Sequence, residues 1–212
     1  MGSLLRDATK QCAGEARIRC VIQACRIIFR NPAETQPILR IPFTELSGED
    51  MQKVIGYEVG GYDYGWFGSI RSNGQGWHEL LHNDGLRDFV QEALAQIGRG
   101  ATEAAALRVA QEVFERCVSI PRVGPATPTR LLAIYRPDLF FSVNRNSIKN
   151  LSQLFRETQG HLRTWGGYKQ ALQVTWRATW YQSPRPVGND EQRAWDARVA
   201  LLDAYCYADE SE

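Results

Sequence analysis

The segment Ser119–Leu132 constrains the fold of this chain most, because it reads as two helices joined by a tight turn. Pro121 follows an apolar residue and ends the first helix, and Gly124 permits a tight turn. Thr127 is a candidate cap for the second helix, and Pro128 suits its first turn, where a missing N–H is harmless. Free backbone N–H groups at such a helix start can hold one phosphate without reading base sequence.

The net charge of +1 hides an uneven distribution of charge along the chain. Between Arg116 and Arg185 there are eleven basic residues and two acidic ones, so this segment carries +9 and the remainder −8. Clustered positive charge is typical of proteins that bind a phosphate backbone, although a solvated basic face also serves other partners.

The spacing of apolar residues predicts a helical protein. One helix is expected over residues 4–29, with its apolar stripe at Ile18, Val21, Ile22, Cys25 and Ile28. Further helices are expected from Asp84 through Leu94, from a Thr102 cap through Cys117, over 128–135, over 144–155, through Tyr168–Trp180, and from Asp190 to Cys206. Residues 31–80 are instead rich in glycine, proline and aromatic residues with little period, which predicts an irregular loop region. The sequence therefore predicts one all-α domain over 1–212 with an irregular aromatic and glycine-rich insertion.

Composition excludes several classes of protein. No apolar run approaches the ~20 residues that a membrane span needs, and no secretory leader is evident, so a cytoplasmic protein without a membrane partner is expected. The five cysteines are odd in number and include no Cys-x-x-Cys pair. This favours reduced thiols and no iron–sulfur cluster, so no cofactor is predicted. Protein partners cannot be read from the sequence.

The hairpin resembles the helix-hairpin-helix motif of the endonuclease III-like DNA glycosylase superfamily. That family has an apolar-Pro-Gly-apolar-Gly turn, and Ile120 to Gly124 reads Ile-Pro-Arg-Val-Gly. A helix and a proline-containing link, residues 136–143, follow, and Asn144 stands 20 residues after Gly124. This is the family's spacing from its last hairpin glycine to the catalytic Asp. Residues 107–155 would then form the helix-hairpin-helix and catalytic-position segment, with double-stranded DNA as the implied partner.

Three departures from the family pattern affect the implied chemistry. Arg122 stands where the family prefers Gly, so a strained or differently shaped turn is expected. Ala126 stands where bifunctional members carry a Schiff-base Lys, which implies a monofunctional enzyme. Asn144 stands where the family has Asp, and an amide can orient water but cannot accept its proton at neutral pH. A natural variant, a descendant that only binds, and an inactivating substitution all stay open.

The resemblance implies a monofunctional DNA glycosylase that flips a modified or damaged base out of the duplex and excises it. Asn144 is its catalytic position. The expected DNA-backbone contacts are Arg122, Val123, Gly124, Ala126, Thr127, Arg130 and Arg145. The expected base pocket in the aromatic loop is formed by Tyr62, Asp63, Tyr64, Trp66, Gln75 and Trp77.

The closing segment 195–205 is similar to blocks in uncharacterised prokaryotic proteins near defence genes. This favours a modified base of foreign or phage DNA as substrate, and hence a role in anti-phage defence. The main alternative is a non-catalytic DNA-binding module that recognises modified DNA.

A second alternative is a zinc metalloprotease. Residues 78–88 match the pattern His-Glu-x-x-His-x-x-Gly-x-x-Asp, with His78, His82 and Asp88 as zinc ligands and Glu79 as general base. The preceding residues form helices poorly, and both methionines, Met1 and Met51, lie upstream of the motif. The favoured interpretation has no metal: the motif opens the helix through Leu94, with its histidines facing solvent or the aromatic loop.

Overall fold

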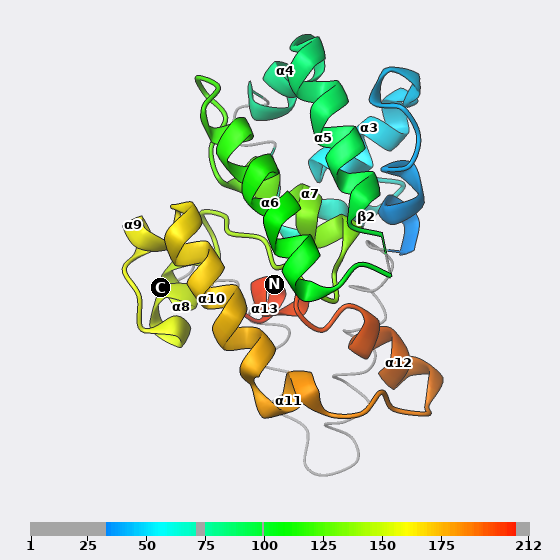
Figure 1. The fold of residues 1–212 in the computed structure, drawn as a ribbon. Helices are drawn as coiled ribbons and strands as arrows, with labels where there is room; N and C mark the ends of the chain where they lie inside the picture. The colour runs from blue at the N-terminus through cyan, green and yellow to red at the C-terminus, as the bar shows by residue number, and fades with distance from the viewer. Residues whose placement is uncertain (1–32, 71–74, 99, 207–212) are drawn as a thin grey trace.

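The computed structural model describes residues 33–70, 75–98 and 100–206, which form a mostly helical protein with one two-stranded sheet (Figure 1). The all-α prediction is therefore confirmed, and the helix expected over 4–29 lies outside the described residues. A helical segment over 33–38 comes first. The elements that follow are η1 (Phe43–Glu45), α3 (Gly48–Ile55), β1 (Glu58–Val59), β2 (Tyr62–Asp63), η2 (Tyr64–Phe67), α4 (Gln75–His82), α5 (Asp84–Gln96), α6 (Glu103–Val118), α7 (Ala126–Tyr135), α8 (Ile148–Phe155), α9 (Gln159–Leu162), α10 (Trp165–Arg177), α11 (Thr179–Gln182), α12 (Asn189–Asp196) and α13 (Leu201–Tyr205).

The long helices form where the apolar period and a capping residue agree. Thr102 caps α6, because its hydroxyl accepts a 3.2 Å hydrogen bond from the N–H of Ala105. Asn83 caps α5 in the same way through the N–H of Leu86 at 3.0 Å. Both helices pack against each other, and α6 also packs on α7 and α10. Among the described residues no helix is long and apolar enough to cross a bilayer.

Helix α7 lies at the centre of the core. Its residues from Thr127 to Ile134 are all buried, so it has almost no solvent face. The segment that follows it, residues 139–143, is also buried and is held on two sides. Trp176 donates to the carbonyl of Leu139, and Tyr168 donates to that of Phe141, both from α10. On the other side the N–H of Val143 donates to the Thr129 hydroxyl of α7. This scaffold fixes the position of Asn144.

The described part of the region 31–80 has more regular structure than predicted. It contains α3 and α4, each eight residues long and too short to give a clear apolar period. Ser47 caps α3 by accepting from the N–H of Asp50, and Gly56 ends the helix at a φ of 98°. The strands β1 and β2 pair as an antiparallel hairpin across Gly60 and Gly61, both at positive φ.

The carboxyl-terminal helices are shorter than the sequence pattern predicts. The expected helix through Trp180 breaks at Ala178 into α10 and α11. The expected last helix breaks into α12 and α13, because the N–H groups of Val199 and Ala200 turn to the carbonyl of Pro137, at 3.2 and 2.9 Å. The helix expected from Asn144 begins at Ile148.

Candidate nucleic-acid interface and the buried Asn144 pair

The turn between α6 and α7 has the backbone shape that a glycine would adopt most easily at Arg122. The φ angle of Arg122 is 71°, in the left-handed region, and its side chain is exposed. Gly124 is exposed and Ala126 is partly buried, while Val123 is buried and anchors the turn to the core. In the described part of the chain the N–H groups of Gly124 and Ala126 have no hydrogen-bond acceptor.

Thr127 does not cap α7, contrary to the prediction. Helix α7 begins one residue earlier, at Ala126, after Pro125 and without a side-chain cap. Thr127 is therefore inside the helix, and its side chain is buried against α4, where a Cβ on Gly76 would come within 2.4 Å of its hydroxyl oxygen. Its expected contact with a DNA phosphate is excluded by this burial.

Helix α4 brings the second sequence signal next to the hairpin. A carboxylate oxygen of Glu79 lies 3.9 Å from a guanidinium nitrogen of Arg122. His78 and His82 are exposed, with ring centroids 4.1 Å apart. The motif forms its own helix and does not open the helix through Leu94, because Asn83 separates the two.

The zinc interpretation finds no third ligand. Asp88 is exposed on α5, where it pairs with Arg87 at 3.0 Å. Among the described residues there is no group of three or more His, Cys, Asp or Glu side chains placed to hold a metal ion. The two histidines are thus a surface feature beside the hairpin.

Arg130 cannot contact DNA, because its side chain is completely buried. The guanidinium donates to the carbonyls of Val54 at 2.6 Å, Tyr64 at 2.8 Å and Lys53 at 3.1 Å, and also to the carbonyl of Gly68. A guanidinium has five N–H donors, and these need protein acceptors once the group leaves water. The predicted phosphate contact is wrong, and Arg130 instead fixes the aromatic region to α7.

The basic segment 116–185 presents less free charge than its composition suggests. Arg136 is also buried, where it pairs with Asp138 and donates to the carbonyls of Ile97 and Gly98. The guanidinium of Arg185 pairs with Asp196 at 2.8 Å. The exposed basic residues of this segment are Arg116, Arg122, Arg145, Lys149, Arg156, Arg163, Arg177 and Arg185. Arg145 stands in the turn between Asn144 and α8, as a surface contact requires.

Asn144 is 8% exposed, and both of its side-chain polar atoms are occupied. Its Nδ2 donates to Oδ1 of Asp203 at 2.6 Å. Its Oδ1 accepts from the N–H groups of Asn146 at 2.9 Å and Ser147 at 3.3 Å, which turns the chain into α8. Asn144 therefore reaches its predicted place at the end of the link, but as a member of a buried polar pair.

Asp203 was not among the predicted site residues, although it is fully buried on α13. Burial raises its pKa from 3.8 to about 7, and the adjacent Ser147, Asn144, Arg130 and Gly68 groups oppose that rise. The hydroxyl of Ser142, near this pair, is buried without a hydrogen-bond partner among the described residues. An acidic residue within the apolar run 199–206 was the only sequence signal for it.

The predicted base pocket is part of the hydrophobic core. Tyr62, Tyr64, Trp66 and Trp77 are all buried, and their rings pack in pairs such as Tyr62–Tyr64, with centroids 4.7 Å apart. Asp63 caps η2 by accepting from the N–H of Gly65. The side chain of Gln75, the first residue of α4, lies outside the described part. These aromatic residues therefore do not line an open site.

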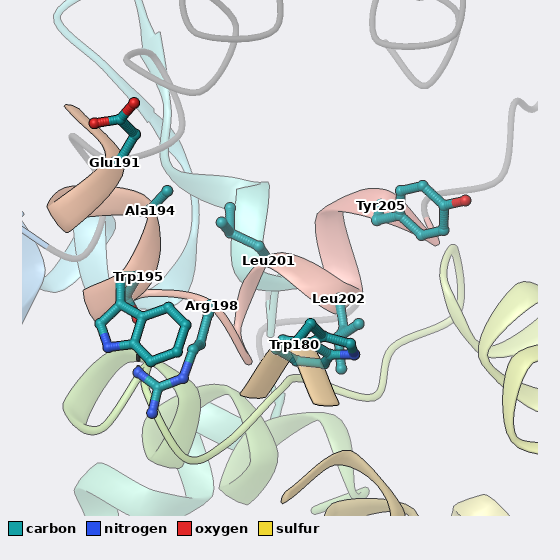
Figure 2. A pocket seen from close by; sticks show the side chains of 8 residues that line it. All are labelled: Trp180, Glu191, Ala194, Trp195, Arg198, Leu201, Leu202 and Tyr205. Atoms are coloured by element: carbon teal, nitrogen blue, oxygen red, sulfur yellow. Dashed lines mark hydrogen bonds between the residues drawn. The ribbon is translucent and has the colours of Figure 1, made fainter. Parts of the chain in front are cut away.

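A pocket of about 430 Å³ lies elsewhere, where α11, α12 and α13 meet (Figure 2). We call it the α11–α13 pocket; its walls are formed by Trp180, Glu191, Ala194, Trp195, Arg198, Leu201, Leu202 and Tyr205. The Arg198 guanidinium is held between two rings, 4.2 Å from the centroid of Trp195 and 4.4 Å from that of Tyr181. The lining is mainly apolar, and it was not predicted from the sequence.

Comparison with known proteins finds no matching family model, no matching curated protein and no matching solved structure. The hairpin therefore stays a resemblance in sequence pattern, and base excision stays a prediction.

Proposed function

We propose that this chain binds duplex DNA through the turn between α6 and α7, without base excision at Asn144. The observation that carries the proposal is the exposed Arg122 in the same turn as the N–H groups of Gly124 and Ala126, which have no acceptor in the described part of the chain. Backbone N–H groups at a helix start, with a guanidinium beside them, suit a phosphate oxygen. Such contacts position a protein on DNA and do not specify sequence.

The state of Asn144 argues against excision at that residue. A group that stabilises a flipped sugar has to reach it, and Asn144 is buried with its amide bound to Asp203. The amide also lacks the negative charge that would stabilise a developing cation. The buried aromatic cluster removes the pocket that a flipped base would have entered.

The test of binding uses Arg122→Ala and a matched control, Arg177→Ala. Arg177 is also exposed and is the last residue of α10, next to α11 (Figure 1). Fluorescence anisotropy with a labelled duplex, measured at several salt concentrations, gives the affinity and its salt dependence. Loss of one phosphate contact should weaken binding several-fold and reduce the log–log salt slope by about 0.9. The Arg177 variant should stay close to the unsubstituted protein.

Arg122→Gly separates binding from folding. Glycine adopts the φ of 71° without strain, so this variant should unfold at an equal or higher denaturant concentration while binding DNA as weakly as Arg122→Ala. Unchanged affinity in both Arg122 variants, or no salt-dependent DNA binding by the unsubstituted protein, would overturn the proposal.

Base excision is the second candidate, and one observation favours it. A carboxylate, that of Asp203, lies 2.6 Å from the residue at the family's catalytic position. Mass spectrometry of bases released from damaged and phage DNA tests this directly. We expect no release; release that is lost in Asp203→Asn while DNA affinity is kept would promote excision over binding alone.

A further inference from the structure

The α11–α13 pocket presents large apolar side chains that nothing among the described residues covers. Trp180 is 42% exposed and Tyr205 is 79% exposed. Glu191, Ala194 and Trp195 lie along one face of α12, and Figure 2 shows Trp195 and Tyr205 toward opposite ends of the pocket. An elongated apolar surface between helices suits an amphipathic helix as its occupant.

We propose that residues 4–29 of this same chain dock on the α11–α13 pocket as an amphipathic helix. The apolar stripe predicted for that segment includes Ile18, Val21, Ile22 and Cys25, with i, i+3, i+4 and i+7 spacing. A stripe of this width matches an apolar groove between two helices. The docking does not depend on the proposed DNA binding.

The path of the chain places this segment within reach of the pocket. Gln36, near the first described residue, donates a 2.7 Å hydrogen bond to the carbonyl of Tyr135. Pro137 stands two residues after Tyr135, and its carbonyl accepts hydrogen bonds from the N–H groups of Val199 and Ala200, directly before α13. The described chain thus begins near the pocket, and a helix over 4–29 would be about 39 Å long, enough to cross it.

Charge favours the same pairing. Residues 1–32 contain six basic and two acidic side chains, a net charge of +4. In helix α12 Asp196 pairs with Arg185 and Asp190 lies 3.9 Å from Arg193, so Glu191 is the acidic side chain of the pocket wall that faces no ion-pair partner within this helix. On a helix Arg19 and Arg26 fall on one flank of the apolar stripe, where they can face the carboxylate of Glu191. Complementary charge fixes the orientation of a docked helix more than its affinity.

Disulfide trapping in the full chain tests the proposal. In a Cys12→Ser, Cys20→Ser background, Cys25 is kept and a second cysteine is introduced by Ala194→Cys or Leu202→Cys in the pocket. The control is Val174→Cys, an exposed site on α10. After mild oxidation, peptide mass spectrometry should find an intramolecular disulfide from Cys25 to either pocket cysteine and none to the control. A disulfide between two chains would show that a second copy of the protein occupies the pocket. Absence of any disulfide from Cys25 to a pocket cysteine would show that residues 4–29 do not dock there. Either result overturns the proposal.

Hydrogen exchange gives a second test that needs no new bond. Ile22→Glu places a charge in the apolar stripe, whereas Gln23→Glu places the same charge on the opposite side of the helix. The first variant should speed amide exchange in α12 and α13 by about tenfold or more, and the second should leave it unchanged. Equal exchange in both variants would contradict docking through the apolar stripe.

Discussion

The side-chain amide of Asn144 donates a 2.6 Å hydrogen bond to the carboxylate of Asp203, a residue 59 positions later in the chain. The bond joins the turn before α8 to α13, and both residues are buried. The residue at position 144 has to donate a hydrogen bond to the Asp203 carboxylate, and an ionised Asp at position 144 would have no donor. Asn144 stands where the glycosylase family has Asp, and its amide is explained in this fold by the hydrogen bond that it donates to Asp203.

Asn144→Asp should destabilise the protein strongly at neutral and high pH. It places a second carboxyl group beside Asp203, where two charges cannot both persist without water. We expect a loss of unfolding free energy on the order of 3 kcal/mol at pH 8 and a smaller loss at pH 5, where the two groups can share a proton. Urea unfolding followed by tryptophan fluorescence measures this. Asn189→Asp, at the exposed start of α12, is the control and should change little.

Asp203→Asn should change how stability depends on pH. The pKa of Asp203 in the folded protein, about 7, is above its ordinary value of 3.8. The folded state therefore holds a proton that the unfolded state releases, and wild-type stability falls as pH rises between about 4 and 7, by up to roughly 4 kcal/mol. The Asn variant lacks this loss and keeps an acceptor for Asn144. The free-energy difference between the two proteins should thus grow across this window, and a constant difference would contradict the raised pKa.

Gly68→Ala should be far more harmful than Gly60→Ala. Both glycines have positive φ, 77° and 58°. A Cβ on Gly68 would come within 2.4 Å of the Ser142 hydroxyl oxygen and 3.0 Å of the Asn144 amide nitrogen, whereas one on Gly60 would meet nothing within 4 Å. We expect about 1 kcal/mol for Gly60→Ala from backbone strain alone, and about 3 kcal/mol or more for Gly68→Ala. Similar midpoints in urea unfolding would show that the Gly68 contact is not tight.

Glu79→Gln should tighten DNA binding. The Glu79 carboxylate lies 3.9 Å from the Arg122 guanidinium and would repel a phosphate placed there. Its removal should raise affinity roughly two- to fivefold at low salt, with a smaller gain at high salt. Glu112→Gln removes an equally negative, exposed side chain from the middle of α6 and serves as the control. An equal gain in both variants would mean that only net charge matters and that the hairpin is not the contact.

The parts of the fold that could be predicted are those governed by local rules. The apolar period and the Thr102 hydroxyl determine α6, and the residues around Pro121 and Gly124 place the turn. The predicted helix boundaries were wrong where a backbone N–H group donates to a distant acceptor and not to a carbonyl of its own helix. The carbonyl of Pro137 does this to Val199 and Ala200, and so divides the last helix.

The candidate site was harder to predict, because burial of a polar group depends on partners far along the chain. Arg130 and Arg122 look equivalent in the sequence, and only the first meets carbonyls more than 60 residues away. The aromatic residues of 57–77 could line a pocket or fill a core with equal ease by composition. The acidic residue in the apolar run 199–206 did not identify Asp203 as a site residue, since its partner is defined only once α13 has packed.

The position of Arg130 has a consequence for how the protein opens. Its acceptors at Lys53, Val54, Tyr64 and Gly68 lie in a stretch of short elements, which are the end of α3, the β1–β2 hairpin and η2. Such a stretch usually fluctuates piece by piece and exchanges its amides early. Here one side chain rooted in the central helix holds all of it, so releasing any part exposes a buried guanidinium. Residues 53–68 and α7 should therefore unfold as a single cooperative unit, and a region that the sequence predicts as an irregular loop should be among the last to open.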